Sequence, residues 1–250
     1  AAIRLLAHEA GETVGPDRPL LSAVLPGSAA RVQAVLAPLV AAPVLAIRKR
    51  PERIFTLDDY VASGAATEGQ AAQLRAAVTA RRNIIVAGGA GSGKTTLLNA
   101  LLAEPAFRAA RTLVLEDTAE LQVSGENVVQ LLTKRAGAQV TLRDLVQTAL
   151  RLRPDRIIVG EVRDAAALDV LKAWNTGHPG GLLTLHANSA ADALGRLEDL
   201  CLEAGGGDPS RLIAQGVDLI VFIERTRAGR RISQILTPHP SQPMSKGDLT

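Results

Sequence analysis

The sequence predicts an α/β protein with a mostly parallel sheet covered by helices on both faces, preceded by a small, partly β N-terminal domain. From about residue 66, short apolar runs alternate with longer helical patterns, which is typical of a parallel sheet with crossover helices. A Gly-rich loop joins one apolar run to a helix. Before this region, residues 1–50 consist instead of short strand-like pieces divided by turns.

The N-terminal domain is expected to be α+β and shortened at its start. Its apolar pieces are separated by turn sequences such as Pro26-Gly27-Ser28. The strands expected in it are residues 20–25, 32–36 and 44–47. The complete division predicts this domain at 1–50, a polar linker at 51–65, the larger domain at 66–237 and a disordered tail at 238–250.

In the larger domain, four- to six-residue apolar runs bounded by polar or Gly residues are expected to be strands. These strands are residues 84–87, 112–115, 128–132, 156–159, 182–185, 219–223 and 231–236. The segments between them have helical patterns, and Thr141 with Asp144 resembles a capping box at a helix start. The expected helices are residues 70–82, 95–102, 141–152, 164–174, 190–202 and 209–215.

Composition excludes several classes of protein. Hydrophobic residues make up 47% of the 250 residues, so a large core is possible, but only 2% are aromatic, which offers few rings for stacking nucleic-acid bases. The net charge of +3 is too modest to indicate a nucleic-acid partner. Cys201 is the one cysteine, so it forms neither an internal disulfide nor a multi-cysteine metal site, and we expect it to be buried in a reducing compartment. The longest apolar run, residues 34–47, contains two prolines and is too short to span a bilayer, so any membrane contact is expected to be peripheral.

The Gly-rich loop matches the pattern G-x-x-x-x-G-K-[ST] in full, and it lies between an apolar strand and a helix. Glycines allow successive backbone N–H groups to point at phosphate oxygens, and the helix N-terminus adds a favourable dipole. We therefore expect this loop to bind ATP, with Lys94 on the β- and γ-phosphates and Thr95 on Mg²⁺. The residues expected to hold the nucleotide here are Gly88, Gly89, Ala90, Gly91, Ser92, Gly93, Lys94, Thr95 and Thr96.

Acidic residues follow two of the expected strands, at the carboxyl ends where ligands gather in open α/β sheets. Glu161 follows the strand at 156–159 after Gly160, where many P-loop enzymes carry a metal-binding Asp, and we expect Glu161 to orient the attacking water. Glu116 directly follows the strand at 112–115, with Asp117 and Glu120 beyond it. Glu116 and Glu120 are expected to reach the metal or its waters in place of the missing Asp, the alternative being a solvated acidic turn.

A histidine follows a third strand. His186 comes directly after 182–185, where it could donate a hydrogen bond to the γ-phosphate, although a lone histidine can also be purely structural. His178 lies in the loop before the same strand, and metal binding by these two histidines has weak support because no acid or cysteine lies at a ligand-like spacing beside them.

The four segments 88–96, 116–121, 157–163 and 176–189 together resemble the type II/IV secretion ATPase superfamily, in the same order along the chain. A strand that ends in Gly-Glu, here Gly160-Glu161, is one mark of that family. The run from Leu171 to Gly181 looks like the Vir-type branch, and residues 31–33, 46–49 and 55–60 are similar to conjugal-transfer ATPases of that branch. The resemblance covers residues 1–237 and implies a RecA-like P-loop core over 66–237.

The resemblance also implies a Mg²⁺-dependent, hexameric ATPase that powers type IV secretion or conjugative transfer. It implies a cytoplasmic location, peripheral at the inner membrane of a bacterium, with the secretion or conjugation machinery as partner. Arg31 and Arg48 match family arginines that reach the phosphates from the N-terminal domain, where a guanidinium can neutralise charge on the γ-phosphoryl group. Three further arginines are candidates for phosphate or subunit contacts: Arg151, Arg153 and Arg163.

The chain departs from the pattern at one place. Conjugal-transfer members carry Gly-Glu-Arg-Phe where this chain has Ala29-Ala30-Arg31-Val32, so the acid and the aromatic residue are missing from the N-terminal domain. The alternative function is a RecA-like DNA helicase or translocase, because its core fold is related. The few aromatic residues and the modest charge count against that alternative.

Overall fold

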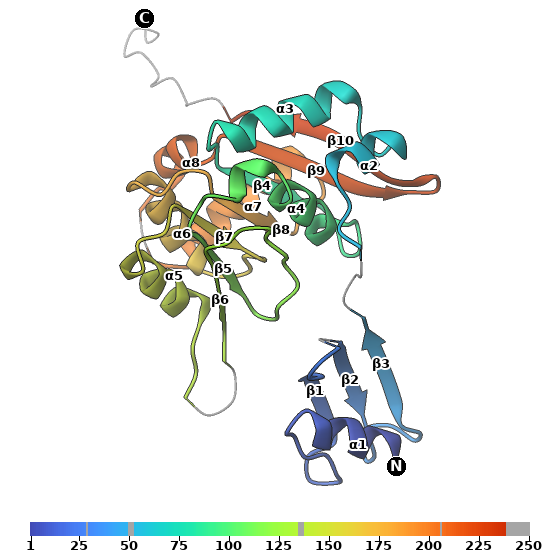
Figure 1. Cartoon of the computed structure of the whole chain (residues 1–250). Coiled ribbons are helices and arrows are strands. Elements are labelled where there is room, and N and C mark those ends of the chain that lie inside the picture. Colours follow the sequence, from blue (N-terminus) through green and yellow to red (C-terminus); the bar gives the residue numbers. More distant parts are fainter. Residues whose placement is uncertain (29, 50–52, 135–137, 206, 239–250) are drawn as a thin grey trace, which may run out of the picture. The chain divides into compact units, whose positions relative to one another are not determined.

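The structure, a computed structural model, describes residues 1–28, 30–49, 53–134, 138–205 and 207–238. The chain divides into two compact units, Ala1–Arg53 and Ile54–Thr250, which are described separately (Figure 1). The disordered tail expected at 238–250 lies outside the described residues apart from Pro238.

The first unit is a three-stranded antiparallel sheet with one helix packed on it. The strands β1 (Leu20–Val24), β2 (Arg31–Val35) and β3 (Val44–Arg48) pair in that order and lie within a residue or two of the expected bounds. Helix α1 (Ala2–Glu9) was not expected, and its buried Ile3 and Ala7, four residues apart, form the apolar stripe that packs on the sheet. This helix makes the unit α+β.

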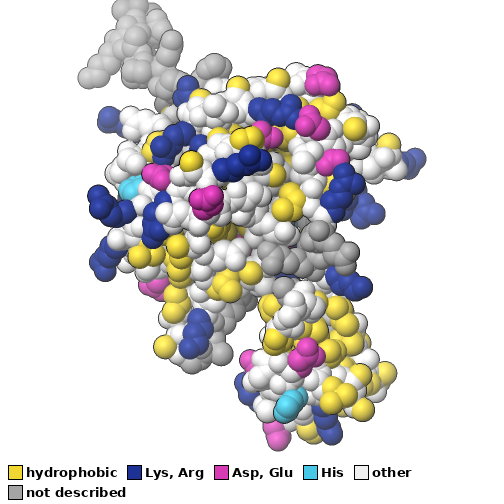
Figure 2. All heavy atoms as spheres, in the orientation of Figure 1, with side chains coloured by type: hydrophobic (Ala, Val, Ile, Leu, Met, Phe, Trp, Pro, Cys, Tyr) yellow, Lys and Arg dark blue, Asp and Glu magenta, His cyan; other side chains and the backbone are white. Residues whose placement is uncertain are grey.

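Strand β3 stays exposed along its whole length, because α1 covers only part of the sheet. Large apolar side chains therefore remain at the surface of this unit, and Figure 2 shows hydrophobic groups on its visible face. They include Leu5, Leu20, Leu39, Val44 and Ile47.

The second unit contains a seven-stranded sheet in the order β10-β9-β4-β8-β7-β5-β6. All neighbouring pairs are parallel except β9 with β10, which form an antiparallel hairpin. The strands are β4 (Ile84–Ala87), β5 (Thr112–Glu116), β6 (Val128–Leu132), β7 (Arg156–Val159), β8 (Leu182–Leu185), β9 (Leu219–Thr226) and β10 (Gly229–Leu236). The expected fold class, a mostly parallel sheet after a small, partly β unit, is confirmed.

Helices cover both faces of this sheet (Figure 1), and each face has its own apolar cluster. One cluster includes α5 (Leu142–Arg151), α6 (Ala166–Asn175), α7 (Ala190–Leu202) and α8 (Ser210–Gly216). The other includes α2 (Leu57–Ala62), α3 (Glu68–Thr79), α4 (Lys94–Leu102) and the short 3₁₀ helix η1 (Pro105–Phe107). The four strands β4, β5, β7 and β8 are buried throughout, which explains why most of their residues are apolar.

Two elements of the second unit differ from the sequence expectations. Within the stretch expected to be a linker, Leu57 and Tyr60 of α2 are buried, and Thr56 with Asp59 forms a capping box at its start. Helix α3 ends at Thr79, three residues before the expected end, because Arg81 adopts a left-handed backbone with φ of 55°.

Cys201 is buried on α7 as expected, and burial raises the pKa of its thiol to about 11. No helix among the described residues has the length and apolar character needed to cross a bilayer.

Candidate active site

The Gly-rich loop, residues 88–93, is called the phosphate loop below, after its expected ligand, and lies between β4 and α4 at the carboxyl edge of the parallel sheet. Gly91 and Gly93 have φ of 66° and 105°, a backbone region that side chains disfavour. At Gly88 the limit is space, because an added Cβ would lie 2.3 Å from the carbonyl oxygen of Ile223 on β9. The loop pattern therefore follows from backbone conformation at two positions and from close packing at a third.

Lys94 is almost fully buried, with 8% of its surface exposed, at the start of α4. Its Nζ donates hydrogen bonds of 3.0 Å to the carbonyl oxygens of both Gly88 and Gly89. The same Nζ lies 3.3 Å and 3.4 Å from the two ring nitrogens of His186. Burial lowers the pKa of Lys94 and nearby Glu161 opposes that change, so this ammonium lies in surroundings that favour an added negative charge.

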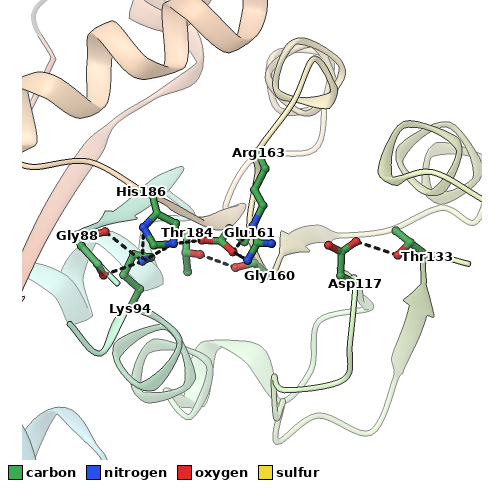
Figure 3. Close-up of polar contacts among 10 residues, drawn as sticks. Gly88, Lys94, Asp117, Thr133, Gly160, Glu161, Arg163, Thr184 and His186 are labelled. Atoms are coloured by element: carbon green, nitrogen blue, oxygen red, sulfur yellow. Dashed lines mark hydrogen bonds and ion pairs between the residues drawn. The ribbon is translucent and has the colours of Figure 1, made fainter. Parts of the chain in front are cut away.

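Glu161 lies beside this lysine and contacts two further side chains (Figure 3). Its Oε1 is 2.8 Å from Nε2 of His186, and its Oε2 accepts a 2.5 Å hydrogen bond from Nε of Arg163 and pairs with Nη2 of the same guanidinium. With its proton on Nε2, His186 donates to Glu161 and leaves Nδ1 to accept from Lys94. The side chains of Lys94, His186, Glu161 and Arg163 thus form one continuous polar chain.

His186 is half-exposed, and burial and the neighbouring ammonium act on it in the same direction. Burial lowers its pKa below the ordinary value of 6.5, Lys94 lowers it further, and Glu161 raises it. The neutral ring is therefore favoured at pH 7, and it can donate from one nitrogen while it accepts at the other.

The side chain of Glu116 takes the place that a side chain at position 160 would need. A Cβ added to Gly160 would lie 2.9 Å from Cγ of Glu116. Oε1 of Glu116 accepts backbone hydrogen bonds from Glu120 and Leu121, at 2.9 Å and 3.0 Å, and the residue is only 4% exposed. Position 160, at the end of β7, therefore has no side chain of its own, and the carboxylate of Glu116 fills the space from β5.

The other predicted metal residues have different environments. Thr95 lies half-buried in the first turn of α4, next to Lys94, and Glu120 lies in the loop after β5, with its carbonyl accepting a 3.3 Å hydrogen bond from Asn99. Asp117 accepts a 2.8 Å hydrogen bond from Thr133, away from Lys94 (Figure 3). Across the described ranges, no three His, Cys, Asp or Glu side chains gather as a metal site would require.

Arg31 and Arg48 belong to the first unit, where they are direct partners across β2 and β3. Directly opposed residues of an antiparallel pair point to the same face, so the two guanidinium groups belong to one face of this small sheet. Their contact with the nucleotide stays a prediction.

Sequence reasoning missed two residues of this region. Thr184 on β8 donates a 2.6 Å hydrogen bond to the carbonyl oxygen of Gly160, and its signal was a polar residue inside a buried apolar strand. Arg230 on β10 lies against Gly93, and no motif marked it.

The chain is similar to known proteins along nearly all of its length. The family described as Type II/IV secretion system protein matches residues 3–232. Conjugal transfer protein TrbB of Rhizobium radiobacter is 48% identical over 233 residues, which cover 92% of this chain and 71% of that protein. The resemblance to the conjugal-transfer members of the family is therefore confirmed.

Two solved structures agree with this fold. The VirB11 ATPase of the Brucella suis type IV secretion system, in complex with sulphate, is 29% identical with a TM-score of 0.61 and covers 94% of this chain and 78% of that chain. The pilus retraction motor PilT with bound ADP has a TM-score of 0.66 at 22% identity, over 89% of this chain and 64% of that chain, and it supports the fold alone.

The contact between positions 160 and 116 can be tested with a double-mutant cycle. Gly160→Ala should lower the free energy of unfolding by about 1–3 kcal/mol, because the new methyl group overlaps Cγ of Glu116. In a Glu116→Ala background the same change should cost much less, because the overlapping atoms are gone. Urea unfolding of the four proteins measures this coupling.

Gly195→Ala is the matched control, because Gly195 is exposed within α7 and an added Cβ meets nothing within 4 Å. It should leave stability unchanged or raise it. Equal costs of Gly160→Ala in both backgrounds would contradict the packing explanation.

The protonation of His186 can be followed by NMR titration of its ring protons. Its pKa should lie below 6.5. Lys94→Ala should raise that pKa because a neighbouring positive charge is lost, and Glu161→Gln should lower it because the favourable carboxylate is lost. The control Glu203→Gln changes an exposed carboxylate directly after the end of α7 and should have no effect. The charge relations in this cluster are wrong if Lys94→Ala lowers the pKa.

Proposed function

Since the chain belongs to the Type II/IV secretion system protein family, we propose that it is a Mg²⁺-dependent, hexameric ATPase that powers type IV secretion or conjugative transfer. One observation carries the enzymatic part of this proposal: Lys94, His186 and Glu161 follow three different strands and meet at one edge of the sheet. The similarity to conjugal transfer protein TrbB supports the transport part. The proposed partners are the secretion or conjugation machinery at the bacterial inner membrane, which a cytoplasmic, peripheral protein would meet there.

ATP binding is assigned to the phosphate loop. The backbone N–H groups of residues 88–93 and the start of α4 bind phosphate oxygens, and Lys94 donates to the β- and γ-phosphates. The donors that Lys94 now directs to Gly88 and Gly89 are redirected to phosphate oxygens that carry full charge. The phosphates add Coulomb attraction to the ammonium, which the neutral carbonyl groups do not supply.

The residues near the loop fit Mg²⁺, which prefers hard oxygen ligands and takes several of them from phosphates and water. Thr95 and Glu116 offer a hydroxyl and a carboxylate, and Glu120 lies in the same loop that binds Glu116. When bound, Mg²⁺ neutralises charge on the β- and γ-phosphates. Because such an ion needs few protein ligands, the lack of a three-acid cluster among the described residues is compatible with this assignment.

Glu161 is assigned to orient the attacking water. Its Oε1 has His186 as partner and its Oε2 has Arg163. A carboxylate oxygen has two lone pairs, so Oε1 can also accept a hydrogen bond from the water. A neutral His186 has one N–H, so it donates toward the γ-phosphoryl group when that N–H turns from Glu161 to the phosphate. Arg31 and Arg48 supply additional positive charge from the first unit in this proposal.

Hydrolysis is tested with variants of the two central residues. Glu161→Gln should bind ATP with affinity close to that of the unaltered chain, but turnover should fall by at least about 100-fold because the amide cannot accept the water's proton. Lys94→Ala should weaken ATP binding itself. Phosphate release and ATP titration measure the two quantities, and a chelator should abolish turnover of the unaltered chain.

The matched control is again Glu203→Gln, which removes an exposed carboxylate at the C-terminal end of α7, opposite to its start at Ala190, and should turn over normally. Normal turnover in Glu161→Gln would exclude this residue as the catalytic acid. Turnover that persists after chelation would exclude a metal requirement for hydrolysis.

The hexamer is tested by light scattering with and without ATP and Mg²⁺. With nucleotide, we expect a mass six times that of one chain. Turnover per chain should fall when the protein is diluted below the dissociation range of the ring, since phosphate contacts from neighbouring units would then be lost. A monomer with undiminished turnover at all concentrations contradicts the ring.

A further inference from the structure

The hairpin formed by β9 and β10 lies directly beside the phosphate loop. β9 pairs with β4 in parallel, and Phe222 is level with Ala87, the last residue before the loop. The backbone of the next residue, Ile223, is so close to Gly88 that no Cβ fits between them. The hairpin therefore continues beyond the end of β4, so the residues after Ile223 and their partners on β10 lie at the level of the phosphate loop (Figure 1).

Arg230, near the start of β10, lies across the turn that opens α4. A Cβ added at Gly93 would be 2.7 Å from Cδ and 3.1 Å from Nε of Arg230. Tyr60 of α2 is also near: burial raises the pKa of its hydroxyl, and the charge of Arg230 partly offsets that increase. Within the described part of the chain, the Arg230 guanidinium has neither a hydrogen bond nor a carboxylate partner.

The two faces of the hairpin differ in charge. On one face Glu224 lies opposite Arg231, and the two form an ion pair of 2.8 Å. On the other face Arg230 lies opposite Arg225, so two positive charges are direct cross-strand neighbours. Like charges in this arrangement destabilise a hairpin, and an anion beside them relieves the repulsion. Figure 2 shows Lys and Arg side chains gathered where this hairpin ends.

We propose that Arg230, with Arg225 opposite it, binds the α- and β-phosphates of the nucleotide from the side of the β9–β10 hairpin. This inference rests on the proposed function, since it needs a nucleotide on the phosphate loop. Arg230 lies against Gly93, the last residue of the loop, and the backbone N–H groups of such a loop bind the α- and β-phosphates. The planar guanidinium fork suits bidentate contact with phosphate oxygens.

The hairpin is held in place by contacts away from the loop. On β10, Ile232 donates a 2.7 Å backbone hydrogen bond to Ala65, and its carbonyl accepts a 3.1 Å bond from Gln70 of α3. Arg230 is two residues before this anchored position. Its backbone is therefore fixed, and the long side chain alone needs to adjust to a ligand.

The test compares ADP and inorganic pyrophosphate on the full chain, by calorimetry and by competition against fluorescent ADP. Arg230→Gln should lower the affinity for both ligands by a similar factor of about 10 to 100, because both carry the phosphates that the guanidinium contacts. Arg230→Lys should lie between Arg230→Gln and the unaltered chain, because it keeps the charge and loses the fork. Arg231→Gln, on the opposite face, should bind both ligands normally.

The outcomes separate this inference from the proposed function. If the unaltered chain binds neither ADP nor pyrophosphate, the nucleotide assignment itself fails. If it binds both and Arg230→Gln binds them equally well, the role of Arg230 is wrong. Weaker binding of ADP with unchanged binding of pyrophosphate would instead assign Arg230 to contact with the base or ribose. Loss of oligomerisation with unchanged affinity would assign Arg230 to contact with a second copy of the chain.

A folding control accompanies these titrations. Without ligand, Arg230→Gln should melt within about 2 °C of the unaltered chain, because an exposed surface residue is replaced. Saturating ADP should then raise the melting temperature of the variant less than that of the unaltered chain at the same concentration.

Discussion

The candidate site depends on close packing at the carboxyl ends of β4 and β7, where neither Gly88 nor Gly160 has room for a Cβ. At Gly88 the carbonyl of Ile223 leaves no room for a Cβ, and at Gly160 the side chain of Glu116 fills that space. Thr184 binds the Gly160 carbonyl from β8, so the end of β7 is held from both sides. Because these positions carry no side chains, Lys94 reaches the loop carbonyls and Glu116 reaches across from the neighbouring strand.

Strand order explains why Lys94, His186 and Glu161, the three side chains of the proposed site, form one chain of contacts. β8 lies between β4 and β7 in the sheet, so the residue after β8 lies between the residues that follow the other two. His186 accordingly contacts Lys94 on one side and Glu161 on the other. The chain passes through β4, β7 and β8 in a different order from their order in space, as in doubly wound sheets generally.

These relations mark how far the sequence could predict the structure. Apolar runs and Gly-rich turns were enough to place the strands of the large sheet and the phosphate loop. Parallel strands that are buried on both faces need nearly continuous apolar sequences, so they are easy to locate. The order of strands was not available from that pattern, so the position of His186 between Lys94 and Glu161 could not be derived. Arg230 was missed because its importance comes from a neighbour 137 positions away in the chain, Gly93, and not from any local motif. Helix α1 was missed because eight residues with two buried positions give a weak periodic signal.

The positive charges around the phosphate loop raise the free energy of the unliganded protein, and a bound polyanion would lower it. Lys94 is buried, and its pKa is lowered mainly by that burial. Arg225 and Arg230 face the same side of their hairpin and repel each other. The carboxylates do not relieve this cost fully, because Glu116 is held by backbone N–H groups and Glu161 by Arg163 and His186. A nucleotide's phosphates would lie among the remaining positive charges, so part of their binding energy comes from relief of repulsion that the fold already contains. Binding and hydrolysis would then change the stability of the same edge of the sheet, which is the coupling that a nucleotide-driven motor requires.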